Sequence, residues 1–262
     1  MIERAPTAEV IAAHFDALLE TAAVPDYPAA VNGLQVANRG APITRIAAAV
    51  DASVRTIDGA AAAGADLLIV HHGLFWSGVQ PIRGPAYARL RALFDNDLAV
   101  YSAHLPLDRH ATLGNNALLA HALGLEATAG FGRFQGVEIG VRGEAERPTA
   151  GLVAAADVFA ARWKGRARAS AFGVDRITRR WAIVTGAGAD AATLAEAEAA
   201  GIDTLIVGEG PHWTAVQAEE RGLVIIYAGH YATETLGVEA LAVEAHARFG
   251  IPWTFIDAPT GL

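Results

Sequence analysis

The sequence contains no cysteine, and this absence removes several kinds of chemistry. Without a thiol the protein cannot form disulfides, use a thiolate nucleophile or hold an iron–sulfur cluster on cysteine. Lysine is almost as rare, because Lys164 is the only one, and its surroundings, RWKGRAR, are typical of an exposed basic turn. A Schiff-base lysine is therefore disfavoured. Any bound metal would have to be held by histidine and carboxylate side chains.

Long apolar runs and basic clusters are missing as well. No 18-residue apolar run occurs, and the N-terminal MIERAPTAEVIAAHFDALLE carries charge throughout, unlike a signal peptide. We therefore expect a cytoplasmic protein that does not associate with membranes. The 20 Lys and Arg against 28 Asp and Glu give a net charge of -8, with no basic cluster interleaved with aromatics. Nucleic-acid binding is therefore disfavoured.

What is present is enough apolar sequence for one large core or two modest cores, since 53% of the 262 residues are hydrophobic. Runs rich in Ile, Val and Leu alternate with Ala-rich segments of helical character, which predicts an α/β fold with largely parallel sheets flanked by helices. The expected strands are 45–50, 65–70, 97–102, 136–142, 180–185, 203–207 and 223–228. The expected helices are 7–22, 53–63, 85–94, 114–123, 150–161, 190–200, 212–221 and 234–248.

Two parts of the chain resemble each other. AGADLLIVHHGLFW (63–76) aligns with AGIDTLIVGEGPHW (200–213), and LAVYSAHLPLD (98–108) aligns with VIIYAGHYATE (224–234). In the second pair, an apolar strand ends in a histidine that is followed four residues later by a carboxylate. Short apolar strands can resemble one another by chance, but the repeated His and acid argue for two related α/β halves.

This repeat suggests a division of the chain into three parts. The first half is expected over 1–129 and the second half over 179–262, with 130–178 as a connecting segment. The two halves are expected to pack as one unit. Because ligands gather beyond the carboxyl ends of parallel strands, we expect a metal site there, between the halves.

His71 and His72 directly follow the apolar strand ADLLIV and precede Gly73, where the backbone can turn sharply. Adjacent residues of an extended strand point to opposite sides. The two imidazoles can therefore share one metal only if the chain has already turned, whereas they can readily serve two neighbouring metals. This geometry favours a dinuclear centre. A His pair that merely caps the next helix is the alternative.

Further candidate ligands close the next strand of each half. Asp108 and His230, with Glu234, complete a mixed nitrogen and oxygen set that suits Zn, Mn, Fe, Co or Ni better than Ca or Mg. Glu234 also falls where a helix N-terminus favours an acid, and both roles can coexist. His104 is either a ligand or a residue that orients Asp108 or a substrate. Glu209 aligns with His72, so it is a candidate acid/base group or a plain loop residue.

Two shorter motifs carry less information. TGAG (185–188) joins a strand to a helix and could cradle a phosphate with backbone amides, although an ordinary strand-to-helix turn is the simpler interpretation. It lacks the third glycine of a dinucleotide-binding fingerprint. NGLQV (32–36) lies in a predicted loop, and its chemistry alone assigns it no role.

Taken together, the motifs resemble the NIF-three-like dinuclear metal-centre family, whose members are often labelled GTP cyclohydrolase type-two homologues. The resemblance covers nearly the whole chain, in order, and matches its short bacterial form. It implies a toroidal hexamer with two divalent transition metal ions per chain, facing an internal cavity. The motifs are NGLQV, HHGLFW, SAHLPLD, TGAG, GEGPH and AGHYATE. The implied ligands are His71, His72, Asp108, His230 and Glu234.

The leading functional hypothesis is a metal-dependent hydrolase, because two neighbouring metal ions can activate a water and polarise the bond under attack. Its substrate would be a small molecule: GTP by the family label, or a phosphoester or cyclic amide by the same chemistry. His104 and Glu209 are the candidates for moving protons. The alternative is a non-catalytic hexamer that stores, senses or delivers metal, or serves as a scaffold.

Overall fold

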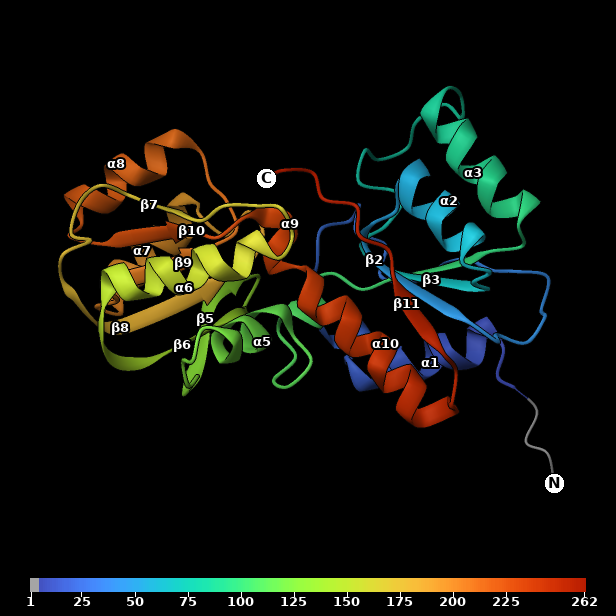
Figure 1. The fold of residues 1–262 in the computed structure, drawn as a ribbon, viewed down its shortest axis with the longest axis horizontal. Helices are drawn as coiled ribbons and strands as arrows, with labels where there is room; N and C mark the ends of the chain where they lie inside the picture. The colour runs from blue at the N-terminus through green and yellow to red at the C-terminus, as the bar shows by residue number, and fades with distance from the viewer. Residues whose placement is uncertain (1–4) are drawn as a thin grey trace. The chain divides into compact units, whose positions relative to one another are not determined.

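The structure is a computed structural model that describes residues 5–262. Contacts between residues divide the chain into two units, each built on its own sheet (Figure 1). The first unit comprises the residues up to Leu107 together with Gly237–Ala258, and the second comprises Asp108–Leu236 with Pro259–Leu262. The expected boundaries at 129 and 178 do not coincide with this division, because the segment 130–178 supplies strands to the second sheet rather than a connection.

The first unit contains a five-stranded sheet in the order β1-β4-β3-β2-β11. Its three central strands and β11 are parallel neighbours, and β1 pairs antiparallel with β4 at one edge. The carboxyl ends of β2, β3 and β4 consequently meet at one edge of the sheet. The strands are β1 (Gly33–Val36), β2 (Ile46–Asp51), β3 (Leu67–His72), β4 (Ala99–Ser102) and β11 (Trp253–Phe255).

Helices cover both faces of the first sheet. Alternate residues such as Ala47 and Leu68 form a buried cluster with Ile57 of α2 and Leu93 of α3. On α1, Phe15 packs against the ring of Tyr101 in β4, with the ring centroids 5.2 Å apart. The helices and turns of this part of the chain are α1 (Ala8–Leu18), η1 (Thr21–Ala23), α2 (Val54–Ala62), α3 (Pro85–Asp95), α4 (Leu105–Asp108) and α10 (Thr235–Phe249).

The second unit contains a six-stranded mixed sheet in the order β5-β6-β8-β9-β10-β7. Only β8, β9 and β10 run parallel, while β5, β6 and β7 pair antiparallel with their neighbours. The parallel core is therefore the same size as β2-β3-β4 in the first unit. The strands are β5 (Ala129–Phe134), β6 (Val137–Pro148), β7 (Arg168–Ala169), β8 (Ile177–Val184), β9 (Thr204–Val207) and β10 (Val224–Tyr227).

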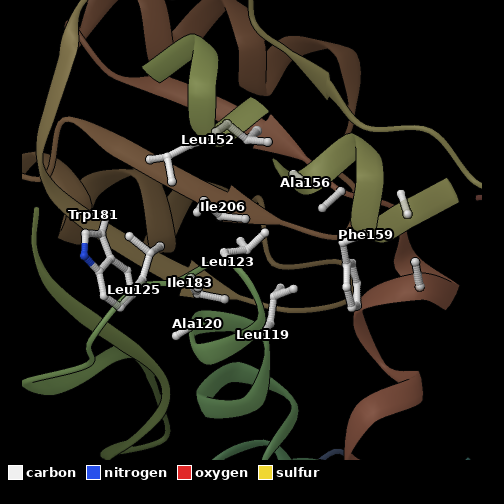
Figure 2. Packing of buried hydrophobic residues seen from close by; sticks show 14 residues of the cluster. Leu119, Ala120, Leu123, Leu125, Leu152, Ala156, Phe159, Trp181, Ile183 and Ile206 are labelled. Carbon is white, nitrogen blue, oxygen red and sulfur yellow. The ribbon is translucent and has the colours of Figure 1, made fainter. Parts of the chain in front are cut away.

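Strand alternation sorts the second core into two layers. Trp181, Ile183 and Ile206 pack with α5 and α6 on one face (Figure 2), whereas Ala182 and Leu205 pack with α7 and α8 on the other. The parallel strands β9 and β10 are therefore buried on both sides, which explains their nearly continuous apolar sequences. The helices are α5 (Asn115–Ala122), α6 (Thr149–Ala161), α7 (Ala191–Ala199), α8 (His212–Glu220) and α9 (His230–Thr233).

The internal repeat extends further than the sequence alignment. Each unit has a strand-helix-strand-helix-strand core followed by a four-residue helix, α4 or α9. In each unit, an earlier strand, β1 or β7, pairs antiparallel with the outer edge of the last core strand. The two units thus share one topology, and His104 and His230 occupy matching places after β4 and β10.

The expected α/β class is confirmed, with two mixed sheets flanked by helices. All of the expected strands and helices occur, with ends that shift by a few residues. The strands β1, β5, β7 and β11 were not expected. They are edge strands or strands paired antiparallel, and short or half-polar segments of this kind carry little periodic signal. Within residues 5–262 no helix is both long and apolar enough to cross a membrane.

The buried layer of Figure 2 gives a test of which contacts stabilise the second unit. Leu152 of α6 is fully buried in it, whereas Val158 of the same helix is 66% exposed. We expect Leu152→Ala to lower the free energy of unfolding by about 2–5 kcal/mol, because it removes buried methyl groups and leaves a cavity. Val158→Ala is the matched control and should change it by about 0.5 kcal/mol or less. Urea unfolding followed by circular dichroism measures both, and equal effects would contradict this layer as a core.

Candidate metal centre

Polar side chains of the first unit gather where its parallel strands end. Asp51 is the last residue of β2, His71 and His72 end β3, and His104 follows β4 by two residues. Asp51 and His72 are register partners across β2 and β3. The strand ends therefore bring together residues that are far apart in the sequence, as the sequence predicted for this edge.

The first-unit cluster consists of His71, His72 and His104. Each offers one ring nitrogen, and these nitrogens all lie within 4.8 Å of one another. The ring centroids of His71 and His72 are 4.8 Å apart, and those of His71 and His104 are 4.9 Å apart. His71 is fully buried, and His104 is nearly so. Although His71 and His72 both belong to β3, the alternation of an extended strand does not separate their rings.

Every imidazole of this cluster has its Nδ1 atom hydrogen-bonded to an oxygen acceptor. His71 Nδ1 lies 2.8 Å from the carbonyl of Ala103, and His72 Nδ1 lies 2.9 Å from Oδ1 of Asp51. His104 Nδ1 lies 2.8 Å from Oδ1 of Asp26. Carbonyl and carboxylate oxygens only accept, so each Nδ1 is a donor, and in the neutral form of each ring the lone pair is on Nε2. This is the arrangement found for metal-binding histidines.

In the second unit, Asp108 ends α4 and is buried. Its Oδ1 accepts a hydrogen bond from Nδ2 of Asn115 at 2.8 Å and a longer one from Oγ1 of Thr185 at 3.4 Å. Both of these donors help to fix the position of the carboxylate.

His230 is the first residue of the short helix α9 in the second unit, and Glu234 caps the C-terminal end of that helix. His230 Nε2 is 3.1 Å from Oε2 of Glu234, which is almost fully buried. On the other side of the ring, Nδ1 lies 2.7 Å from Oε1 of Glu209. Burial alone would lower the pKa of His230, but the two carboxylates outweigh it and raise that pKa to about 9. The protonated ring of His230 therefore lies between two carboxylates, and a metal ion could replace the proton on its Nε2 atom.

Two glycines make room for the side chains of His230 and Glu234. A Cβ atom on Gly186 would collide with Oε1 of Glu234 and would come within 3.3 Å of Nε2 of His230. A Cβ on Gly208 would come within 2.8 Å of both the His230 Cα and Oγ1 of Thr233. Strand register places Gly186 at the position of Asp51 in the first unit. The donors and their charges fit a divalent cation, so the His and Glu clusters of both units could hold metal ions.

The structure therefore assigns positions to the expected residues. His71, His72 and His104 meet in the first unit, and His230, Glu234 and Glu209 meet in the second. Glu209, expected as an acid/base group or a loop residue, contacts the ring of His230. Glu234 also directly precedes α10, as its second expected role required.

Sequence reasoning missed two of the carboxylates that orient these rings. Asp51 ends a buried strand, so the rule that singled out His71 and His72 could also have found it. Asp26 lies in a loop between two prolines and gives no periodic or positional signal. Its partner, His104, is far away in the sequence, so only the fold shows the pairing.

The TGAG segment is an ordinary strand-to-helix turn. The amide of Thr185 donates to Asn116 at 2.8 Å, and the amide of Gly186 donates to Thr233 at 3.1 Å. Asp190 caps the helix that follows, accepting from the amide of Thr193. These amides are engaged within the protein, and an acid occupies the helix start where a phosphate would have to bind.

Comparisons with known proteins find relatives over nearly the whole length of the chain. A family model described as Duf34/NIF3 (NGG1p interacting factor 3) matches residues 7–260. A Deinococcus radiodurans protein named GTP cyclohydrolase 1 type 2 homolog is 45% identical over 93% of this chain and 90% of its own. A Pyrococcus abyssi protein of the same name is 42% identical over 97% of this chain and 99% of its own. The crystal structure of TTHA1606 from Thermus thermophilus matches with a TM-score of 0.84 and 35% identity, covering 98% of this chain and 100% of that one.

The space beside His230 and Glu234 can be tested with a single methyl group. Gly186 and Gly222 have φ values of +61° and +68°, so alanine strains the backbone similarly at both. Only Gly186 has side chains in the way, because a Cβ on Gly222 meets nothing within 4 Å. We expect Gly186→Ala to lower the Zn²⁺ affinity measured by calorimetry at least about tenfold. Gly222→Ala should lower stability by about 1 kcal/mol and leave affinity unchanged; equal affinities in both variants would refute the assignment.

The raised pKa of His230 predicts a pH dependence for metal binding, because a metal must displace the proton from this ring. The shift from 6.5 to about 9 means that this competition persists up to about pH 9. Zn²⁺ affinity, measured by chelator competition, should therefore keep rising above pH 6.5 and level off near pH 9. In the metal-free protein the same shift stabilises the fold fully below pH 6.5, and this stabilisation is lost as the pH rises through about 9.

The control for this pH dependence is Glu209→Gln. It removes one of the carboxylates that raise the pKa of His230, so the affinity should level off at a lower pH than in the unmodified protein. An affinity that is already constant between pH 7 and 9 in the unmodified protein would contradict the prediction.

Proposed function

The chain belongs to the Duf34/NIF3 (NGG1p interacting factor 3) family, and from this premise we propose that it is a metal-dependent hydrolase. Two divalent transition metal ions per chain, chosen from Zn, Mn, Fe, Co and Ni, would be its cofactors. The proposed ligands are His71, His72, Asp108, His230 and Glu234.

The observation that carries this proposal is the common orientation of the histidines. The Nδ1 atoms of His71, His72 and His230 are bonded to a carbonyl or carboxylate at 2.7–2.9 Å. A histidine in an ordinary core needs no such uniform arrangement. An acceptor on Nδ1 holds one proton there, so Nε2 is the nitrogen that binds a metal once it is unprotonated, and the same acceptor raises ligand basicity. Buried carboxylates then supply the negative charge that offsets two divalent cations.

The residues around the clusters have separate roles in the proposed reaction. When bound, a pair of divalent ions supplies activation of water and polarisation of the bond under attack. Glu209 keeps the ring of His230 in the orientation that presents Nε2. His104 presents its own Nε2 beside His71 and His72, where it can accept a proton or a hydrogen bond from a substrate. Trp76 packs against His104 at 4.7 Å and limits access of bulk water to that ring.

The substrate class follows from the chemistry and from the relatives. A small molecule with a hydrolysable bond suits two metal ions: a nucleotide, a phosphoester or a cyclic amide. The relatives are named GTP cyclohydrolase 1 type 2 homolog, so GTP, with hydrolytic opening of its purine ring, is the first substrate to assay. We further propose that the protein acts as a homo-oligomer, a hexamer, in the cytoplasm.

This function can be tested by removing the charge of the Glu234 carboxylate while keeping the shape of its side chain. Glu234→Gln should lower metal affinity by more than about 100-fold and abolish hydrolysis together, because it replaces a buried ligand charge with a neutral amide. Glu220→Gln, an exposed position on α8, is the matched control and should change neither. Elemental analysis of the purified proteins gives metal content, and hydrolysis is assayed with GTP, phosphoesters and cyclic amides in defined metals.

Two outcomes would replace the proposal. Full hydrolysis by a preparation stripped of metal would show that the reaction does not depend on these ligands. Tight and reversible metal exchange without turnover of any substrate in the panel would instead identify a protein that stores, senses or delivers metal, or serves as a scaffold.

A further inference from the structure

The carboxylate of Asp26 lies at the centre of a buried hydrogen-bond network behind His104. Its side chain is 7% exposed and accepts four hydrogen bonds. Oδ1 accepts from the Tyr27 amide at 2.7 Å and from His104 Nδ1 at 2.8 Å. Oδ2 accepts from Asn32 Nδ2 at 2.8 Å and from the Leu105 amide at 2.9 Å. All four acceptor positions of the carboxylate are therefore filled by donors.

Asn32 and Gln35 of the NGLQV segment connect this network to both strand ends. Asn32 donates to Asp26 and, through Oδ1, accepts the backbone amide of His104 at 2.7 Å. Gln35 accepts the amide of Leu74, just beyond His71 and His72, at 2.7 Å. The segment thus holds the loop after β3 and the loop after β4 with side-chain bonds from one edge strand.

The backbone before Asn32 is unusual, which indicates that this placement is maintained at some cost. Val31 has a φ of 45°, in the left-handed region that β-branched residues rarely adopt. Such conformations persist where surrounding contacts fix them, and they cluster at functional sites. Here the contacts are the carbonyls of Ala30 and Val31, which accept from Gln35 Nε2 at 2.9 Å each.

We infer that Asp26, supported by Asn32, is a positioning residue that acts through His104. It fixes the ring in the tautomer with the proton on Nδ1, so that the Nε2 lone pair is directed at the His71 and His72 cluster. This inference rests on the proposed function for the role of His104 in the reaction. It adds a residue that neither the sequence motifs nor the candidate ligands include.

The charge of Asp26 agrees with this role. Burial alone would raise its pKa, but the hydrogen bonds from His104, Asn32 and the Tyr27 amide lower the pKa below its usual range. The group is therefore an ionised acceptor, which leaves His104 Nδ1 as the donor. The edge of Trp76 packs against the ring of His104 at an interplanar angle of 76° and opposes its rotation.

The four donors around Asp26 predict what an amide would do in its place. An Asn at position 26 must put its NH2 group where one carboxylate oxygen was. The Oδ2 side faces two fixed donors, Asn32 Nδ2 and the Leu105 amide. The Oδ1 side faces one fixed donor, the Tyr27 amide, and His104, which can become an acceptor by moving its proton from Nδ1 to Nε2. Asp26→Asn should therefore invert the tautomer, as loss of the orienting acid does in catalytic triads.

The test is nitrogen NMR of protein labelled with 15N-histidine, with the His104 signals assigned from their absence in His104→Gln. In the unmodified protein we expect a protonated Nδ1 and an unprotonated Nε2, and in Asp26→Asn the reverse. Asp16→Asn is the matched control, because Asp16 is a half-buried acid of the same unit that accepts from the Tyr101 hydroxyl at 2.9 Å. It should leave the His104 signals unchanged.

Metal content and turnover complete the test. Asp26→Asn should keep the zinc content of the unmodified protein and lower kcat by about two to four orders of magnitude on a substrate that the protein hydrolyses. An unchanged tautomer, or an inverted tautomer with unchanged kcat, would overturn the inference while leaving the proposed function intact. If the unmodified protein bound no metal, the proposed function would fail, yet the nitrogen signals of the metal-free protein would still decide the role of Asp26.

Discussion

The hydrogen bond at Nδ1 of each clustered histidine is the interaction on which the rest of both sites depends. An imidazole can bind a metal or accept a proton only through a nitrogen that carries a lone pair. The acceptors on Nδ1 leave Nε2 as the nitrogen that can take this role at His71, His72, His104 and His230, and at His230 Nε2 must first lose its own proton. These acceptors come from the backbone, from a strand end and from loops, so the fold supplies them in different ways for the same chemical result.

The two units show how one topology can produce two different sets of donors. Where the first unit has Asp51, His71 and His72, the matching register positions of the second unit hold Gly186, Gly208 and Glu209. All three positions carry polar side chains in the first unit, whereas two of the three are glycines in the second. The space beside these glycines is occupied by His230 and Glu234, which come from the short helix and the cap after β10.

Burial and charge reinforce each other at these positions. Glu234 is almost fully buried, and a buried carboxylate needs a compensating charge nearby. In the second unit the proton on His230 meets part of this requirement, which explains its raised pKa. In the first unit, hydrogen bonds from His104, from Asn32 and from backbone amides stabilise the buried carboxylate of Asp26. The strand ends are thus stable without a metal and are arranged so that a cation can take the place of the proton.

The sequence by itself determined the α/β class, the succession of core strands and helices, and the importance of residues just after β3, β4 and β10. It could do so because hydrophobic periodicity and the position of polar residues at strand ends are local properties. It left open whether His71 and His72 serve one metal or two, because adjacent residues of a strand point to opposite sides; in the structure both belong to β3 and their ring centroids are 4.8 Å apart.

Only the tertiary structure decided which side chains orient the histidines and where the units divide. Asp26 reaches His104 across 78 positions of sequence, and Gly186 matters because of the atoms that surround its missing Cβ. NGLQV, without a role from its chemistry alone, became the support of two loops once β1 paired with β4. Such contacts depend on strand pairing between distant segments, and no local pattern in the sequence encodes the distance between them.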